Sequence, residues 1–289
     1  MSGLRFLVVD GNPLERREAH QREFGKAPGT AYGDALLAVS PRGSGYDICF
    51  PADEGANLPL GAAIADYDGV ALTGSSLHLW KRDAAVERQI ELAREIFRSR
   101  TAFFGSCWGV QMASVAAGGD VQKNPLGREL GIARNIALND AGRMHPLLSG
   151  RPAAYDAPAI HLDIVTLPPP DCTVLASNAL SPVQAAEIRH DGGVFWGVQY
   201  HPEFSLTEVA VILRRLADNM VTEGFSAGRE ASLAYAQALI TLDGDRTRTD
   251  LAWHHGITAD VLDDTRRMTE IRNWIDHQVK PMAVSRGRG

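Results

Sequence analysis

Thr101-Ala-Phe-Phe-Gly-Ser-Cys-Trp-Gly-Val-Gln111 is the stretch that decides the fold. Its first five residues form an apolar run of strand character, and a small-residue helical segment over 108–117 follows almost at once. Glycines stand two residues before and two residues after Cys107. Side chains at those two positions would clash in a sharp strand-to-helix turn, so glycine fits there. The stretch therefore predicts a tight elbow with Cys107 at its tip.

Strand and helix patterns alternate on the N-terminal side of this elbow. Apolar strands are predicted over 4–9, 46–50, 69–73 and 101–105, and helices over 14–24 and 84–98. Strands separated by helices of this length favour a parallel sheet with helices on both faces. We therefore expect an α/β fold with an open, mostly parallel sheet flanked by helices.

The C-terminal side of the elbow has a different pattern. The dipeptide Asp191-Gly192 is a strong signal for a two-residue hairpin turn. Short strands are predicted over 160–167, 173–176, 182–190 and 194–200. They indicate a small antiparallel extension of the parallel sheet, and a helix over 205–220 is predicted to follow it.

The last part of the chain is predicted to be helical. Residues 224–228 resemble a linker, and apolar residues recur every three or four positions over 258–279. We expect one domain over residues 1–224 and a C-terminal helical extension over 225–289. This extension is expected to pack on the core or to face a partner.

Composition excludes several classes of protein. The chain has 289 residues, of which 45% are hydrophobic and 22% are charged, as in an ordinary soluble globular protein. Its 29 Lys and Arg against 35 Asp and Glu argue against nucleic-acid binding. The apolar run before Asp10 is too short for a signal peptide or a membrane span, so we expect a cytoplasmic protein with no membrane partner.

Cysteine usage points to reactivity at one position. The three cysteines, Cys49, Cys107 and Cys172, are widely spaced and odd in number, so the sequence predicts neither a disulfide framework nor a metal site. No cofactor motif is present, and we expect no cofactor. A thiol at a helix N-terminus has a lowered pKa, and backbone N–H groups there face a developing oxyanion. The alternative for Cys107 is an inert, buried thiol in a glycine-rich turn.

A second motif favours the reactive interpretation of Cys107. The stretch Gly197-Val-Gln-Tyr-His-Pro-Glu-Phe204 ends a predicted strand with His201 and Glu203, and Pro202 fixes the backbone between them. A cysteine nucleophile needs a neighbouring base, and the base needs an acceptor that holds its orientation. Cys107, His201 and Glu203 supply these three groups.

Together the two motifs resemble those of the class I, triad-type glutamine amidotransferases. The similarity covers residues 4 to 220 and is nearest to stand-alone proteins that resemble the amidotransferase domain of GMP synthetase. The resemblance implies a flavodoxin-like fold and hydrolysis of glutamine to glutamate and ammonia through a thioester on Cys107. It implies that His201 is the base and that Glu203 orients it.

The resemblance also implies contacts around this triad. The oxyanion hole would come from the backbone N–H groups of Trp108 and of the Gly74-Ser75 loop. Gln111, His161 and Asp163 would lie at the substrate glutamine.

Two departures keep other functions open. Thr73-Gly-Ser-Ser76 stands where the family often has Gly-Gly-Pro, and no acceptor-site motif is present, so any ammonia would pass to a synthetase or acceptor subunit on another chain. The first alternative is a γ-glutamyl hydrolase or transferase acting on γ-glutamyl peptides, amines or folate conjugates. The second is a non-catalytic binding subunit. His20, His78 and His145 have no partner at an informative spacing and predict no site.

Overall fold

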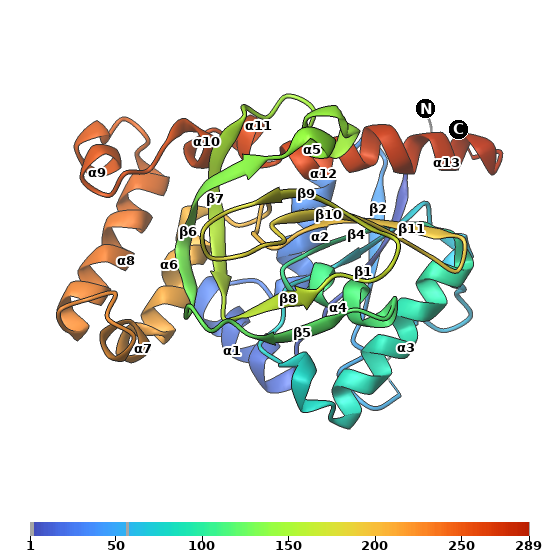
Figure 1. The fold of residues 1–289 in the computed structure, drawn as a ribbon, viewed down its shortest axis with the longest axis horizontal. Helices are drawn as coiled ribbons and strands as arrows, with labels where there is room; N and C mark the ends of the chain where they lie inside the picture. The colour runs from blue at the N-terminus through green and yellow to red at the C-terminus, as the bar shows by residue number, and fades with distance from the viewer. Residues whose placement is uncertain (1–2, 56–57, 289) are drawn as a thin grey trace.

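A nine-stranded sheet runs through the middle of the molecule (Figure 1). The computed structural model describes residues 3–55 and 58–288. The strands of the whole described chain are β1 (Arg5–Val9), β2 (Gly45–Cys49), β3 (Gly69–Leu72), β4 (Ala102–Ser106), β5 (Asp120–Lys123), β6 (Glu129–Leu138), β7 (Ala154–His161), β8 (Asp163–Leu167), β9 (Cys172–Ser177), β10 (Ala185–His190) and β11 (Gly193–Val198).

Strand order separates a parallel half from an antiparallel half. The order is β2-β1-β3-β4-β11-β10-β9-β6-β7, and the first five strands are parallel to their neighbours. From β11 onward each neighbouring pair is antiparallel, and β10 and β11 form the predicted hairpin. β5 and β8 pair separately as a small antiparallel sheet. The predicted fold class, an α/β sheet flanked by helices, is confirmed.

Helices cover both faces of the sheet and its antiparallel end. The α-helices before the C-terminal region are α1 (Leu14–Phe24), α2 (Pro28–Ala38), α3 (Ala84–Ser99), α4 (Trp108–Ala116), α5 (Asp140–Met144), α6 (Leu206–Arg215) and α7 (Ala217–Thr222). Those that follow are α8 (Arg229–Gly244), α9 (Thr249–His254), α10 (Ala259–Leu262), α11 (Asp264–Arg267), α12 (Thr269–Trp274) and α13 (Lys280–Ser285).

The alternation of side chains along β1 places apolar residues on both faces. Phe6 and Val8 belong to a core shared with α2 and α12, whereas Leu7 and Val9 belong to a core shared with α3 and α4. A parallel strand that is buried on both faces has a continuous apolar sequence. This is why apolar and polar residues do not alternate along β1. A third core joins α6 and α8 to β6, where Figure 1 shows α8 outside α6.

The C-terminal residues are helical, as predicted, and their last part packs across the parallel half of the sheet. Trp274 lies with its ring centroid 5.9 Å from that of Phe6 and 5.5 Å from that of Phe104. A Cβ on Gly69 would meet the Trp274 ring at 2.7 Å, so glycine in β3 makes room for the indole. The division into residues 1–224 and 225–289 stays a prediction.

Several elements differ from the sequence predictions, among them β5, β6 and most of β7, which were not predicted as strands. Residues 258–279 are not one helix, because the Asp263 side chain accepts from the backbone N–H of Thr265 and caps a new helix there, and residues Ile275–Val279 form a π-helical turn. The helix α2 was not predicted; its Gly33 lies against Tyr46, where a Cβ would meet the ring at 2.5 Å. Residues 160–167 are two strands in different sheets, with Leu162 between them.

Candidate active site

Cys107 lies at the elbow between β4 and α4. Its backbone has φ 51° and ψ −97°, a conformation that L residues rarely adopt and that a packed turn must enforce. A Cβ on Gly105 would lie 2.7 Å from Cα of Gly109, and a Cβ on Gly109 would lie 3.1 Å from the Leu72 carbonyl oxygen. Both glycines are therefore required by close backbone approach, and the predicted elbow is confirmed.

The fold brings His201 and Glu203 to Cys107 because β4 and β11 are adjacent and parallel. Chain segments that follow neighbouring parallel strands emerge at the same edge of a sheet. His201 donates from Nδ1 to Oε1 of Glu203 at 2.7 Å, and its backbone N–H donates to the Pro158 carbonyl at 2.7 Å. The ring of Phe204 stacks on the imidazole at 3.9 Å between centroids. The structure thus places the three predicted triad residues together.

Electrostatics favour the protonated form of His201. Burial disfavours the imidazolium, but the negative charge of Glu203 and hydrogen bonds with Cys107 and Glu203 outweigh burial and raise the pKa of His201 to about 10. The imidazole therefore holds a proton at neutral pH, next to the sulfur. The Cys107 Sγ lies 3.9 Å from the carbonyl oxygen of Ile160 on its other side.

A chain of hydroxyl groups supports Glu203 and was not predicted from the sequence. The Ser106 hydroxyl donates to Oε2 of Glu203 at 2.8 Å, and the Tyr32 hydroxyl lies 3.0 Å from the Ser106 oxygen. Burial and the nearby Glu203 charge raise the pKa of Tyr32 well above its usual value, so its hydroxyl stays protonated. Both carboxylate oxygens of Glu203 are therefore paired, which fixes its orientation.

The predicted oxyanion loop lies directly against His201. A Cβ on Gly74 would meet Cε1 of His201 at 2.7 Å, so only glycine leaves room for the ring. Asn12 holds the loop through Nδ2 to the Gly74 carbonyl at 2.9 Å and through Oδ1 to the Ser76 N–H at 3.1 Å. The Ser75 hydroxyl donates to the Gly11 carbonyl at 2.8 Å, which fixes the other side of the loop.

Trp108 is the first residue of α4, so its backbone N–H lies among the groups that have no partner within the helix. Its side chain is buried and donates from Nε1 to Oε1 of Gln89 at 2.9 Å. The indole therefore anchors the start of α4 and stays away from the reacting atoms.

The predicted substrate residues lie in the same cavity, held by partners of their own. Gln111 donates from Nε2 to the Asp163 carbonyl at 2.8 Å. His161 donates from Nε2 to Glu129 at 2.8 Å, and the Asp163 carboxylate accepts from Nδ1 of His78 at 2.6 Å. Burial raises the pKa of the Glu129 carboxyl group, but the hydrogen bond and the charge of His161 outweigh burial. The pKa of Glu129 is therefore below its usual value.

Three histidines for which the sequence predicted no partner each have a carboxylate partner from a distant part of the chain. Those partners could not be found by spacing, because the contacts join separate elements. The pairs are His20 with Glu208, His78 with Asp163, and His145 with Glu187.

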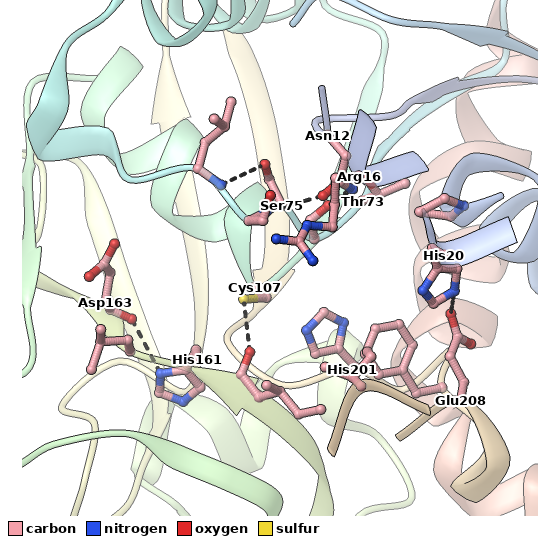
Figure 2. A pocket seen from close by; sticks show the side chains of 18 of the residues that line it. Asn12, Arg16, His20, Thr73, Ser75, Cys107, His161, Asp163, His201 and Glu208 are labelled. Atoms are coloured by element: carbon pink, nitrogen blue, oxygen red, sulfur yellow. Dashed lines mark hydrogen bonds and ion pairs between the residues drawn. The ribbon is translucent and has the colours of Figure 1, made fainter. Parts of the chain in front are cut away.

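The triad residues, the Gly74-Ser75 loop and the predicted substrate residues line a cavity of about 320 Å³ (Figure 2). In Figure 2, Cys107 and His201 lie between His161 and Asp163 on one side and His20 and Glu208 on the other, and Gln111 also lines the cavity. Within residues 3–55 and 58–288, no three His, Cys, Asp or Glu side chains are grouped so as to hold a metal ion. None of the helices in that part of the chain combines the length and apolar character needed to cross a bilayer.

Residues 52–218 match the sequence model of the class-I glutamine amidotransferases, which is more than half of the chain. The chain belongs to the class I glutamine amidotransferase family. The resemblance predicted from the two motifs is therefore confirmed. Family membership, together with a similar protein whose name denotes a hydrolase, indicates an amidohydrolase.

Similar proteins within this family fall into two groups. A γ-glutamyl-L-1-hydroxyisopropylamide hydrolase from a Pseudomonas species is 36% identical over 290 residues, covering 98% of this chain and 96% of that protein. A glutamine-hydrolyzing GMP synthase from Aeropyrum pernix is 33% identical, but the match covers 56% of this chain and only 29% of that protein. Similarity over the whole length is thus to the first protein.

Solved structures confirm the fold. A glutamine amidotransferase from Thermotoga maritima matches with a TM-score of 0.64 at 16% identity, covering 97% of this chain and 100% of that one. A glutamine amidotransferase from Methylobacillus flagellatus matches with a TM-score of 0.59 at 18% identity, covering 98% and 95%. At these identities the likeness concerns the fold alone.

Proposed function

We propose that this family member hydrolyses a γ-glutamyl amide bond, with Cys107 as nucleophile, His201 as acid and base, and Glu203 as the orienting carboxylate. The observation that supports it is that the elbow thiol and His201 line one cavity, with the His201 imidazole held by Glu203 at 2.7 Å. Such a nucleophile, base and orienter form a catalytic unit in cysteine hydrolases.

The reaction proceeds in two steps. In the first, the Cys107 sulfur, its proton taken by His201, attacks the amide carbonyl carbon, and the imidazolium protonates the departing nitrogen. The carbon–nitrogen bond breaks, ammonia or an amine leaves, and a γ-glutamyl thioester remains on Cys107. In the second, His201 takes a proton from water, the resulting hydroxide attacks the thioester, and glutamate and the free thiol are released.

Backbone donors and the predicted substrate residues complete the proposed site. The N–H groups of Trp108 and of the Gly74-Ser75 loop would receive the tetrahedral oxyanion, where one donor is worth about 10² to 10³ in rate. Gln111, His161 and Asp163 would hold the glutamyl half of the substrate.

Glutamine is the first candidate substrate, since the chain belongs to a family of glutamine-hydrolysing domains. Its ammonia would pass to a synthetase subunit on another chain, as the partial similarity to GMP synthases suggests. The second candidate is a γ-glutamyl amide with a larger amine. It is favoured by the full-length similarity to a γ-glutamyl amide hydrolase, which includes the C-terminal region.

Comparison of purified variants tests this proposal. The wild type should release glutamate from glutamine or from γ-glutamyl amides, and Cys107→Ala should abolish the release because the thioester cannot form. Cys172→Ala removes a partly buried thiol that does not line the cavity, and should retain the activity. Equal release by the wild type and Cys107→Ala would overturn the proposal, and the ratio of rates on the two substrate types would assign the substrate.

A further inference from the structure

The cavity continues past Cys107 into a region between α1 and α6. His20 of α1 and Glu208 of α6 form a buried pair at 3.1 Å that joins the two helices, and the apolar residues Ile212 and Leu216 also line the cavity. Figure 2 shows His20 and Glu208 on the opposite side of Cys107 from His161 and Asp163. The reaction centre therefore separates two halves of the cavity.

One charged side chain of this lining differs from the rest. Arg16 lines the cavity from α1, and within the described ranges its guanidinium has neither an ion pair nor a hydrogen bond. The other charged or titratable side chains of the lining each have a partner within hydrogen-bonding distance, among them His161 with Glu129. The other pairs are Asp163 with His78, Glu203 with His201, Glu208 with His20, Arg128 with Glu223, and Arg215 with Glu23.

The position of Arg16 explains why it faces the cavity. Arg16 and His20 are four residues apart on α1, so they lie on one face of the helix, and His20 is fixed toward α6 by Glu208. In Figure 2 the Arg16 side chain extends toward the space above Cys107 and His201. Arg16 is partly buried, and its planar fork of N–H donors matches the two oxygens of a carboxylate.

We propose that Arg16 binds a carboxylate on the amine half of the substrate, so that the preferred substrates are γ-glutamyl amino acids or peptides. This inference rests on the proposed function, which places the scissile amide at Cys107 and the glutamyl half at Gln111 and Asp163. The amine half then occupies the side with Arg16, His20 and Glu208. Ammonia as the leaving group would leave this half unfilled, and an uncharged amine would leave the guanidinium unpaired.

Binding to the Cys107→Ala protein tests the proposal without turnover. Four probes separate the two carboxylates of the substrate: γ-glutamylglycine has both, γ-glutamylglycinamide has only the α-carboxylate, 4-aminobutyrylglycine has only the amine-half carboxylate, and 4-aminobutyrylglycinamide has neither. Adding Arg16→Gln should weaken binding of the two glycine probes by about 10- to 100-fold, the range for one charged hydrogen-bonded contact. Affinity for the two glycinamide probes should be unchanged.

A matched control uses the same helix. Arg22 is 68% exposed in its side chain and does not line the cavity, so Arg22→Gln should leave all four affinities unchanged. Thermal unfolding of each variant establishes that the protein is folded. Because no thiol is needed for binding, a lack of hydrolysis by the wild type would count against the proposed function while leaving this measurement valid.

Three results would overturn the proposal. If the Cys107→Ala protein binds every probe with the same affinity with and without Arg16→Gln, there is no carboxylate site at Arg16. A loss confined to the probes with the α-carboxylate would assign Arg16 to the glutamyl half. Failure of folded Cys107→Ala protein to bind γ-glutamylglycine at millimolar concentration would exclude this substrate class.

Discussion

The carboxylate of Glu270 accepts a hydrogen bond of 2.9 Å from the hydroxyl of Tyr200, the residue that directly precedes His201. On the other side of His201, Arg267 donates from Nε to the Pro202 carbonyl at 3.2 Å. The C-terminal region thus binds the chain before and after the proposed base. It supports the site from outside residues 52–218, which match the family model.

Replacing Glu270 with Gln should strongly destabilise the protein. Glu270 and Arg151 are almost completely buried and pair at 2.6 and 2.8 Å, so the substitution leaves a buried guanidinium without its counter-charge. Breaking such a pair by removing one partner costs about 3–5 kcal/mol in the free energy of unfolding. Denaturant unfolding measures this loss.

Glu230→Gln is the control for that prediction. Glu230 is exposed in the first turn of α8, so its replacement should change the free energy of unfolding by less than about 0.5 kcal/mol. If Glu270→Gln is as stable as Glu230→Gln, the buried pair does not have the proposed structural role.

The parts of the site that could be predicted from sequence are those encoded by neighbouring residues. Gly105 and Gly109 around Cys107 indicate the elbow, and Pro202 between His201 and Glu203 indicates a fixed pair. The parallel pairing of β4 with β11 brings the two motifs together. This pairing could not be predicted, because the sequence placed residues 194–200 in the antiparallel extension.

The supporting contacts could not be predicted, because each joins residues far apart in the chain. His20 and Glu208 are 188 residues apart, and Tyr32 and Ser106 are 74 apart. Spacing rules describe one helix or strand and contain no information on which elements pack together. The guanidinium of Arg16, which has no partner among the described residues, was missed for the same reason, since the lack of a partner is a property of the folded cavity.

Gly74→Ala should impair catalysis while leaving the fold intact. The added Cβ would meet Cε1 of His201 at 2.7 Å, so the imidazole must shift from its position beside the thiol. A displacement of about 1 Å at a reacting group can cost about 100-fold in rate. We expect kcat for γ-glutamyl amide hydrolysis to fall by about this factor, as steady-state kinetics will measure.

Gly244→Ala provides the comparison for Gly74→Ala. Gly244 is the exposed last residue of α8, and no atom in the described part of the chain lies within 4 Å of a Cβ there, so that variant should keep the wild-type kcat. A normal kcat for Gly74→Ala would show that the loop does not confine His201.

The pH dependence of kcat/KM should report the ion pair of His201 and Glu203. With the pKa of His201 raised to about 10, the imidazolium that protonates the leaving nitrogen is retained through neutral pH and lost near pH 10. Because the Glu203 carboxylate stabilises the imidazolium, Glu203→Gln should lower this pKa and move the alkaline limb to lower pH. A pH profile of each protein measures the shift.

An exposed carboxylate serves as the reference for that pH shift. Glu87 is 43% exposed in its side chain and pairs with Arg82 outside the cavity, so Glu87→Gln should leave the profile unchanged. An alkaline limb at the same pH in the wild type and Glu203→Gln would contradict the proposed role of Glu203.

The hydroxyl chain from Tyr32 through Ser106 to Glu203 predicts non-additive substitutions. Ser106→Ala removes a hydrogen bond of 2.8 Å to a carboxylate and leaves the Tyr32 hydroxyl without its acceptor, at a cost of about 1.5–3 kcal/mol in the free energy of unfolding. Tyr32→Phe should also destabilise the wild type. In the Ser106→Ala background its cost should be smaller, because the shared hydrogen bond has already been lost.

A double-mutant cycle measured by denaturant unfolding tests this coupling, which should lie within about 0.5–3 kcal/mol for residues in contact. Tyr67→Phe gives the matched cycle: the Tyr67 hydroxyl donates to Asp47 at 2.9 Å and shares no partner with Ser106, so its cost should be the same in both backgrounds. Equal costs of Tyr32→Phe in both backgrounds would mean that Tyr32 does not act through Ser106. In that case only the hydroxyl of Ser106, the residue before Cys107, would support Glu203.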